Sequence, residues 1–172
     1  LETEAILLAL GDDLATAEAV LDDWATDADD PDVVDALSAA ASRFESAAVD
    51  VAGHVDRDPR TDAAVGDYLA GAETDGERAG AGLLGLPLVL DRRLLQAVSY
   101  FVNEANTTRA DLVRDLRSEC EDVLDLARDL LADADDADRR AAEEAAVAVV
   151  EAAYADYAET LDGMGLDPRP IC

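Results

Sequence analysis

The sequence has no lysine, a single histidine and two cysteines, and only 4% of its residues are aromatic. Cys120 and Cys172 are too few for a disulfide scaffold, and they do not form the CxxC spacing that suits zinc or redox chemistry. This cysteine usage fits a reducing compartment. We therefore expect a cytoplasmic protein.

Long apolar runs are also missing. The longest, residues 83–90, is interrupted by Gly85 and Pro87 and is far shorter than the roughly 18 residues of a membrane-spanning helix. Glu2 and Glu4 stand where a signal peptide would be basic, so the sequence does not support export by that route. We expect no contact with a membrane.

Negative charge dominates what is present. The 172 residues include 41 acidic and 13 basic residues, which gives a formal charge of −28. A free-standing nucleic-acid binder needs a basic face against the phosphates, so the charge argues against nucleic acid as a partner. It also implies self-repulsion, which concentrated salt weakens because the Debye length falls from about 8 Å at 0.15 M to about 3 Å at 1 M.

The kinds of charged residue are as unusual as their number. Aspartate occurs 28 times against 13 glutamates, all 13 basic residues are arginine, and alanine occurs 36 times. This composition resembles that of proteins from salt-in halophiles, above all haloarchaea. The resemblance covers the whole chain and implies a salt-rich cytoplasm, but it indicates no protein family.

Half of the residues are apolar, and they recur at the 3-4 spacing of amphipathic helices. No segment alternates apolar and polar residues as a strand does. We predict an all-α fold, an antiparallel helical bundle of about five main helices in a single domain over residues 1–172. Its expected parts are a helical hairpin over 1–55, a glycine-containing connector over 56–86, a three-helix segment over 87–165 and a tail over 166–172.

Five apolar stripes mark the helix faces that we expect to be buried. They are Leu7, Leu10, Leu14, Ala17, Leu21 and Trp24; Val34, Leu37, Ala41, Phe44, Ala48, Val51 and Val55; Leu90, Leu94, Ala97, Val98, Phe101 and Ala105; Val113, Leu116, Cys120, Val123, Ala127 and Leu130; and Val147, Val150, Tyr154, Tyr157 and Leu161. Helix-spaced ion pairs are expected between Arg117 and Glu121, Asp111 and Arg114, and Asp125 and Arg128.

Capping residues predict several helix ends. Asp30 suits an N-cap with Pro31 in the first turn. Thr108 with Asp111 reads as a capping-box variant that starts the fourth long helix, and we favour a turn near Asp135 before the last one. The residues expected to end the last helix are Gly163, Gly165 and Pro168.

Residues 80–85, Gly-Ala-Gly-Leu-Leu-Gly, match the GxGxxG motif, in which backbone amides approach a pyrophosphate. That motif needs a hydrophobic strand before it, whereas residues 72–79 are polar. We interpret the glycines as a close helix crossing or a hinge. We expect the glycines of 71–85 to interrupt any long element, and the third long helix to begin at Pro87.

Residues 22–27, Asp-Asp-Trp-Ala-Thr-Asp, resemble the aspartate-rich motif of the prenyl-transferring isoprenoid synthases. The resemblance implies carboxylates that hold magnesium on a diphosphate. A second, facing aspartate motif is missing, so we favour a solvated acidic helix end. Some acidic residues are spaced four apart, as a dinuclear metal site in a helical bundle requires: Asp111 with Asp115, Glu121 with Asp125, and Asp125 with Asp129. Roughly ten such pairs arise by chance on helices of this composition.

Few other residues suggest chemistry. His54 offers a general base, but no nucleophile is placed to partner it, and we interpret it as lining the C-terminal end of the second helix. Cys120 lies on a packing stripe and reads as a core residue, whereas Cys172 in the proline-rich tail is expected to be an exposed, reactive thiol. We predict no catalytic, cofactor-binding or metal-binding residues.

Residues 94–104, 105–107 and 108–116 have the lengths of a helix-turn-helix. The start of the last of these segments resembles the second helix of winged-helix regulators, which implies DNA binding. A basic recognition helix and a β-wing are missing, so we favour a plain helical hairpin, with the sequon residue Asn106 as a helix cap. The arginines of the DNA-binding alternative are Arg92, Arg93, Arg109 and Arg114.

Long amphipathic stripes without a convergent polar cluster predict a non-catalytic protein that acts by protein interaction, as a dimer or an accessory subunit. The expected contact faces are the leucine-rich segment 83–95 and the edge formed by Tyr154 and Tyr157. The alternatives are a helix-turn-helix-like transcription regulator and a helical-bundle enzyme with a carboxylate-bound metal.

Overall fold

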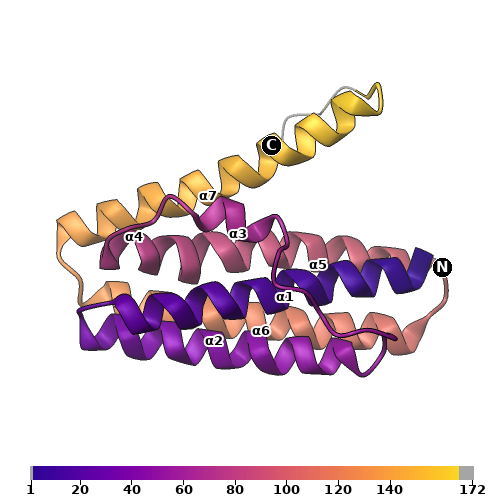
Figure 1. Cartoon of the computed structure of the whole chain (residues 1–172), viewed down its shortest axis with the longest axis horizontal. Helices are drawn as coiled ribbons and strands as arrows, with labels where there is room; N and C mark the ends of the chain where they lie inside the picture. The colour runs from indigo at the N-terminus through magenta and orange to yellow at the C-terminus, as the bar shows by residue number, and fades with distance from the viewer. Residues whose placement is uncertain (1, 167–172) are drawn as a thin grey trace.

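The computed structural model of the chain describes residues 2–166, and these residues contain helices and no strand. The predicted all-α bundle with about five long helices is therefore confirmed (Figure 1). The elements are α1 (Glu2–Asp27), α2 (Pro31–Ala52), α3 (Val65–Leu69), α4 (Asp75–Gly80), the π-helical turn η1 (Ala81–Gly85), α5 (Leu86–Asn103), α6 (Thr107–Ala132) and α7 (Asp136–Gly163).

Helices α1, α2, α5 and α6 form an antiparallel four-helix bundle (Figure 1). α1 packs along α2 in the predicted hairpin, α5 packs along α6, and the contacts of α2 with α6 and of α1 with α5 close the bundle. Large side chains such as Phe44 and Phe101 are fully buried between them. The first four predicted stripes supply this core over most of their lengths, because 3-4 spacing keeps apolar side chains on one face of each helix.

Capping side chains confirm the predicted starts of two helices and correct a third. Asp30 accepts a hydrogen bond from the backbone N–H of Asp32 at 2.9 Å at the start of α2. Asp135 caps α7, which confirms the turn between the last two helices. Asn106 caps α6, as the sequon suggested, so the predicted capping box at Thr108 is wrong. The side chain of Asn106, two residues before Thr108, already accepts the hydrogen bond at the start of the helix.

The glycine-rich segment does not interrupt the chain. α4, η1 and α5 form one continuous helical rod from Asp75 to Asn103, so the predicted start at Pro87 is wrong. A proline inside a helix clashes with the carbonyl group four residues earlier. Here Pro87 follows the π turn, in which the Leu86 N–H donates to the oxygen of Ala81, and this wider turn lies where the clash would occur.

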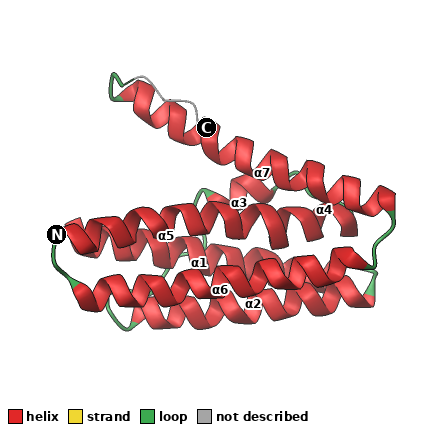
Figure 2. Cartoon of the chain, turned by 180° about the vertical axis from the view of Figure 1, so that it is seen from behind, coloured by secondary structure: helices red, strands yellow, loops and turns green. Residues whose placement is uncertain are grey.

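α7 lies outside the four-helix bundle and differs most from its prediction. Its N-terminal half packs against α4 and η1, and its C-terminal half rises away from the other helices (Figures 1 and 2). The buried side chains are Ala142, Ala146 and Val149. The predicted stripe is therefore not the packed face, since Val147 is 55% and Tyr157 48% exposed. Two of the three buried residues are alanines, whose small side chains let α7 approach the glycines of α4 and η1 closely.

Candidate functional site

The base of α7 is docked by direct helix-to-helix contact. A Cβ atom added at Gly80 would lie 1.9 Å from the carbonyl oxygen of Ala142, and one added at Gly85 would lie 2.8 Å from the Cβ of Val149. No side chain other than hydrogen fits at such distances. The interpretation of the GxGxxG segment as a close helix crossing is thereby confirmed, and it explains why α7 approaches this rod so closely.

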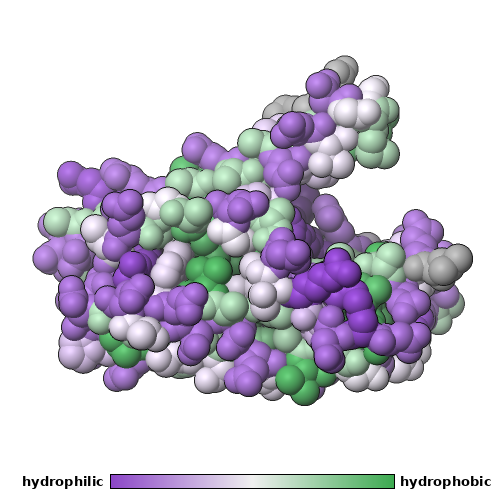
Figure 3. All heavy atoms as spheres, viewed as in Figure 1, coloured by the Kyte–Doolittle hydropathy of each residue, from purple (hydrophilic) through white to green (hydrophobic). Residues whose placement is uncertain are grey.

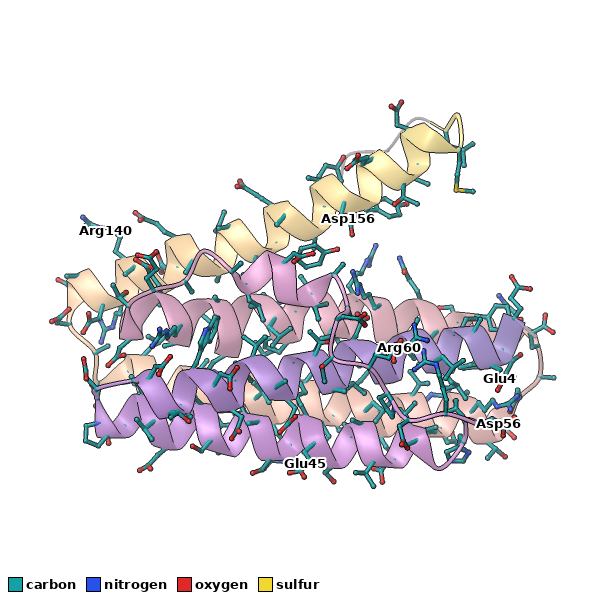
Figure 4. All side chains as sticks on the ribbon, viewed as in Figure 1. Glu4, Glu45, Asp56, Arg60, Arg140 and Asp156 are labelled. Atoms are coloured by element: carbon teal, nitrogen blue, oxygen red, sulfur yellow. The ribbon has the colours of Figure 1, made fainter. Side chains whose placement is uncertain are left out.

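A chain of polar side chains ties α7 to the bundle further along. The Nη1 atom of Arg93 on α5 donates to both carboxylate oxygens of Asp13 on α1 at 2.7 Å. Its Nη2 atom donates to the hydroxyl oxygen of Tyr68 on α3 at 3.1 Å. The Tyr68 hydroxyl in turn donates to Asp156 on α7, which Figure 4 shows on the side of α7 near α3. Four elements meet in this network.

Burial sets the protonation of the network. The pKa of Asp13 is raised because burial removes its hydration, and the positive charge of Arg93 offsets this only in part. Burial, followed by the hydrogen bond to Asp156, raises the pKa of Tyr68 to about 12. Tyr68 therefore stays protonated and donates at neutral pH. The donors of Arg93 are directed at protein groups, so the network holds helices in place.

An open groove of about 360 Å³ lies between α1 and α5 beside this network. Ile6, Leu10 and Tyr100 supply much of its apolar wall, and Gln96 is polar. Figure 3 shows open space between the projecting half of α7 and this end of the molecule. The groove's charged residues, Asp13 and Arg93, are paired with each other.

The connector between α2 and α4 is fixed by neighbouring polar residues of α1. The carboxylate of Asp12 accepts from both terminal nitrogens of Arg57, at 2.9 and 2.7 Å, and from the backbone N–H of Arg60 at 2.7 Å. The hydroxyl oxygen of Thr16 accepts from the backbone N–H of Ala63 at 3.1 Å. These contacts give the polar residues inside α1 a structural role.

The most conspicuous surface feature is apolar. Eight large hydrophobic side chains are exposed within residues 2–166, and five of them lie on α7 or directly after it: Val147, Val150, Tyr157, Met164 and Leu166. We use the name outer stripe for six residues of α7 and its C-cap that follow each other at alternating steps of three and four, namely Val147, Val150, Tyr154, Tyr157, Leu161 and Met164. Val147, Val150, Tyr157 and Met164 are exposed, and Tyr154 and Leu161 are half-buried. Large contiguous apolar patches are uncommon on the surface of monomeric proteins.

Several residues that the sequence suggested lie apart from one another. Asp22, Asp23 and Asp27 are exposed at the end of α1, as expected for a solvated helix end. His54 is exposed just after α2. In the part of the chain from Glu2 to Leu166, no three His, Cys, Asp or Glu side chains lie close enough together to hold a metal ion.

The prediction for Cys120 is confirmed, whereas the structure does not test the prediction for Cys172. Cys120 is fully buried in the core, as predicted, and burial raises the pKa of its thiol to about 12. A thiol with so high a pKa is a poor nucleophile. Cys172, predicted to be exposed and reactive, lies outside the described residues.

Other predicted surface residues are used within the fold. Segment 83–95 is mostly core, so the prediction of a contact face there is wrong; most of its hydrophobic residues are buried, and Leu88 is the exposed exception. Arg117 pairs with Asp91 on α5 at 2.8 Å instead of the predicted Glu121. The expected pairs Asp111–Arg114 and Asp125–Arg128 are present. The long helix α6 packs along α5 as a plain hairpin.

Comparisons with protein-family models, with curated proteins and with solved structures found no significant match. In the described part of the chain, no helix combines the length and the apolar character needed to cross a membrane.

Proposed function

We propose that this protein is a non-catalytic interaction protein of a salt-adapted cytoplasm, and that the outer stripe of α7 is its contact surface. The observation that carries the proposal is the exposure of this stripe, with Val147 at 55%, Tyr157 at 48% and Met164 at 69%. Exposed aromatic and aliphatic side chains of this kind commonly serve as anchors in protein interfaces. The two tyrosines expected to form a contact edge belong to it.

The way in which α7 is held supports the same function. Its base is fixed against Gly80 and Gly85, and Asp156 is bound through Tyr68. Beyond these contacts the helix continues to Gly163 and diverges from the bundle (Figure 1). A helix anchored in this way presents its free half in a defined direction, which lowers the conformational cost of binding a partner.

Charge explains why the contact surface is apolar. A net charge of −28 repels most acidic partners at low salt, and in concentrated salt ion pairs contribute little. Burial of apolar area does not depend on charge screening, and excluded salts strengthen it. A salt-adapted protein therefore gains more from an aliphatic and aromatic contact than from charged groups.

Photo-crosslinking in the native host tests the proposal. A benzophenone amino acid is placed at Tyr157, and the matched control carries it at Val49, which is 65% exposed on α2. We expect discrete protein adducts at position 157 and none at position 49, with mass spectrometry identifying the attached protein. No adduct at position 157, or the same adducts at both positions, contradicts a contact function of the outer stripe.

A further inference from the structure

We infer that the outer stripe of α7 binds the outer stripe of a second copy of this chain, with the two helices antiparallel. This inference rests on the proposed function, because it names the partner of the same surface. Three features of α7 support it: the spacing of the stripe, the residues that flank it, and the divergence of the helix from the bundle toward its C-terminal end.

The spacing is that of a coiled-coil seam. The six residues follow one another at steps of 3, 4, 3, 4 and 3, so they occupy alternating a and d positions of a heptad repeat. The stripe spans residues 147–164, about 27 Å of helix at 1.5 Å per residue. Such a seam is buried when a second helix with the same repeat packs against it.

The stripe is also symmetric about its own centre. In an antiparallel pair centred between positions 154 and 157, Tyr154 meets Tyr157 of the partner subunit, and Val150 meets Leu161 of the partner subunit. The outermost layer joins Val147 to Met164 of the partner subunit. Every layer then contains one a and one d residue, as in antiparallel coiled coils, and a two-fold axis generates a closed dimer.

The flanking residues allow two acidic molecules to approach here. The e and g positions beside the seam hold a single acid, Glu151, and small uncharged residues. The uncharged ones are Ala153, Ala158 and Thr160, together with Ala146, which is buried against η1 at the docked end of α7. The other acids of this half, Asp156, Glu159 and Asp162, lie at c, f and b positions away from the seam. In the antiparallel register Glu151 faces Ala158 of the partner subunit, so no acid opposes another acid across the pair. Like charges placed opposite each other would disfavour pairing.

The way α7 diverges from the bundle favours the antiparallel direction. α7 contacts the bundle in its N-terminal half, where Ala142 and Ala146 are buried, and it rises away from the bundle toward its C-terminal end (Figure 1). Parallel pairing would place the two docked halves, each held against its own acidic bundle, next to each other. Antiparallel pairing places each docked half beside the projecting half of the other chain, so the repulsion between the two docked ends is smaller.

The mass of the purified protein in about 2 M KCl, where the Debye length is near or below 3 Å, tests the pairing. We expect light scattering to give twice the 18.1 kDa of one chain. The double variant Val150→Asp, Tyr157→Asp should be monomeric with an unchanged helix content, because both side chains lie on the exposed stripe. The matched control Val102→Asp changes a 51% exposed valine of α5 and should remain a dimer.

Disulfide crosslinking tests the direction in a Cys172→Ser background, in which the remaining thiol, Cys120, is buried. A mixture of Val150→Cys and Leu161→Cys chains should form a mixed disulfide with a mild oxidant, and Val150→Cys alone should not. Efficient crosslinking of Val150→Cys with itself would overturn the antiparallel pairing. A strict monomer in solution, combined with adducts to a different protein at position 157 in cells, would overturn the second copy as partner and leave the proposed contact function standing.

Discussion

Gly80 of α4 and Ala142 of α7 bring the backbones of two helices into direct contact, with only 1.9 Å between the place of a Cβ on Gly80 and the carbonyl oxygen of Ala142. A glycine inside a helix costs about 1 kcal/mol relative to alanine. At this position the cost is offset by the close approach of α7, which buries Ala142 completely. The proposed contact surface therefore depends on a residue that bears no side chain.

Substituting alanine for Gly80 should destabilise the protein by about 1–3 kcal/mol, because the methyl group forces α7 away from the rod and this exceeds the gain in helix propensity. Gly76 is the matched control in the same helix, since a Cβ there would lie 3.5 Å from its nearest neighbours. Gly76→Ala should leave stability unchanged or raise it by up to about 1 kcal/mol. Urea unfolding in concentrated KCl measures both, and equal effects of the two substitutions would contradict the close crossing.

The ion pair of Asp13 and Arg93 gives a prediction with a pH dependence. Arg93→Met leaves the buried Asp13 carboxylate without its counter-charge and should cost about 2 kcal/mol at pH 7, less than a fully buried pair because the Arg93 side chain is 31% exposed. The pKa of Asp13 is already raised in the folded protein, and losing Arg93 raises it further. A raised carboxyl pKa favours the folded state at low pH, so the deficit should shrink as the pH falls toward 4.

The double variant Asp13→Leu, Arg93→Met is the control for that experiment. Removing both charges leaves no unpaired group, and it should recover much of the stability lost by Arg93→Met. The measurement is the free energy of unfolding at pH 4 to 7. A deficit of Arg93→Met that does not change with pH would show that lost packing, and not the unpaired carboxylate, is responsible.

The core of the four-helix bundle was predictable from sequence because burial of large side chains leaves a clear period. Leu7, Leu37 and Leu116 each belong to a series of buried apolar residues that are spaced three to four apart along one helix. A helix that buries one face requires this spacing. The caps at Asp30 and Asp135 were equally local, since each side chain binds a backbone N–H two or three residues later. Information within one helix was sufficient for these features.

The glycine segment could not be predicted in this way, because its stability comes from a helix more than fifty residues later in the chain. Local propensity treats Gly80 and Gly85 as helix breakers. Their partners, Ala142 and Ala146, are small residues four apart on α7, which is a compatible pattern, but nothing in the sequence pairs the two segments. The same ambiguity affected α7, which carries two stripes, and periodicity alone does not say which of them is buried.

The polar network was missed for a related reason. Asp13, Tyr68, Arg93 and Asp156 come from four elements spread over most of the chain. With 41 acidic residues, any arginine has many candidate partners, and only the fold selects Asp13 for Arg93. The single usable signal was that Asp13 follows Leu10 by three residues and so lies near the buried face of its helix.

The pH dependence of stability should reveal the contribution of Asp12, whose carboxylate holds the connector between α2 and α4. The hydrogen bond from Arg57 holds the pKa of Asp12 below its usual value of 3.8. A lowered carboxyl pKa stabilises the folded protein above the unfolded-state value, and this contribution is lost as the pH falls through the folded pKa. Asp12→Asn should therefore be less stable than the wild type at pH 6, and the difference should narrow below pH 3.8. Subtracting the free energy of unfolding of Asp12→Asn from that of the wild type at each pH cancels the contributions of the other carboxylates. A difference between the two proteins that stays constant down to pH 2 would exclude this role of Asp12.

Salt should stabilise the protein, because repulsion among 41 acidic residues outweighs the few ion pairs that salt weakens. The exposed pairs Asp111–Arg114 and Asp125–Arg128 are worth only a few tenths of a kcal/mol each. Raising KCl from about 0.15 M to about 1 M shortens the Debye length from about 8 Å to about 3 Å, so the free energy of unfolding should rise over this range. Replacing the exposed Asp22, Asp23 and Asp27 by asparagine removes three negative charges without touching the core, and it should reduce the slope of stability against salt. Sucrose at equal osmolality controls for effects other than screening, and a stability that falls with KCl would contradict a salt-adapted setting.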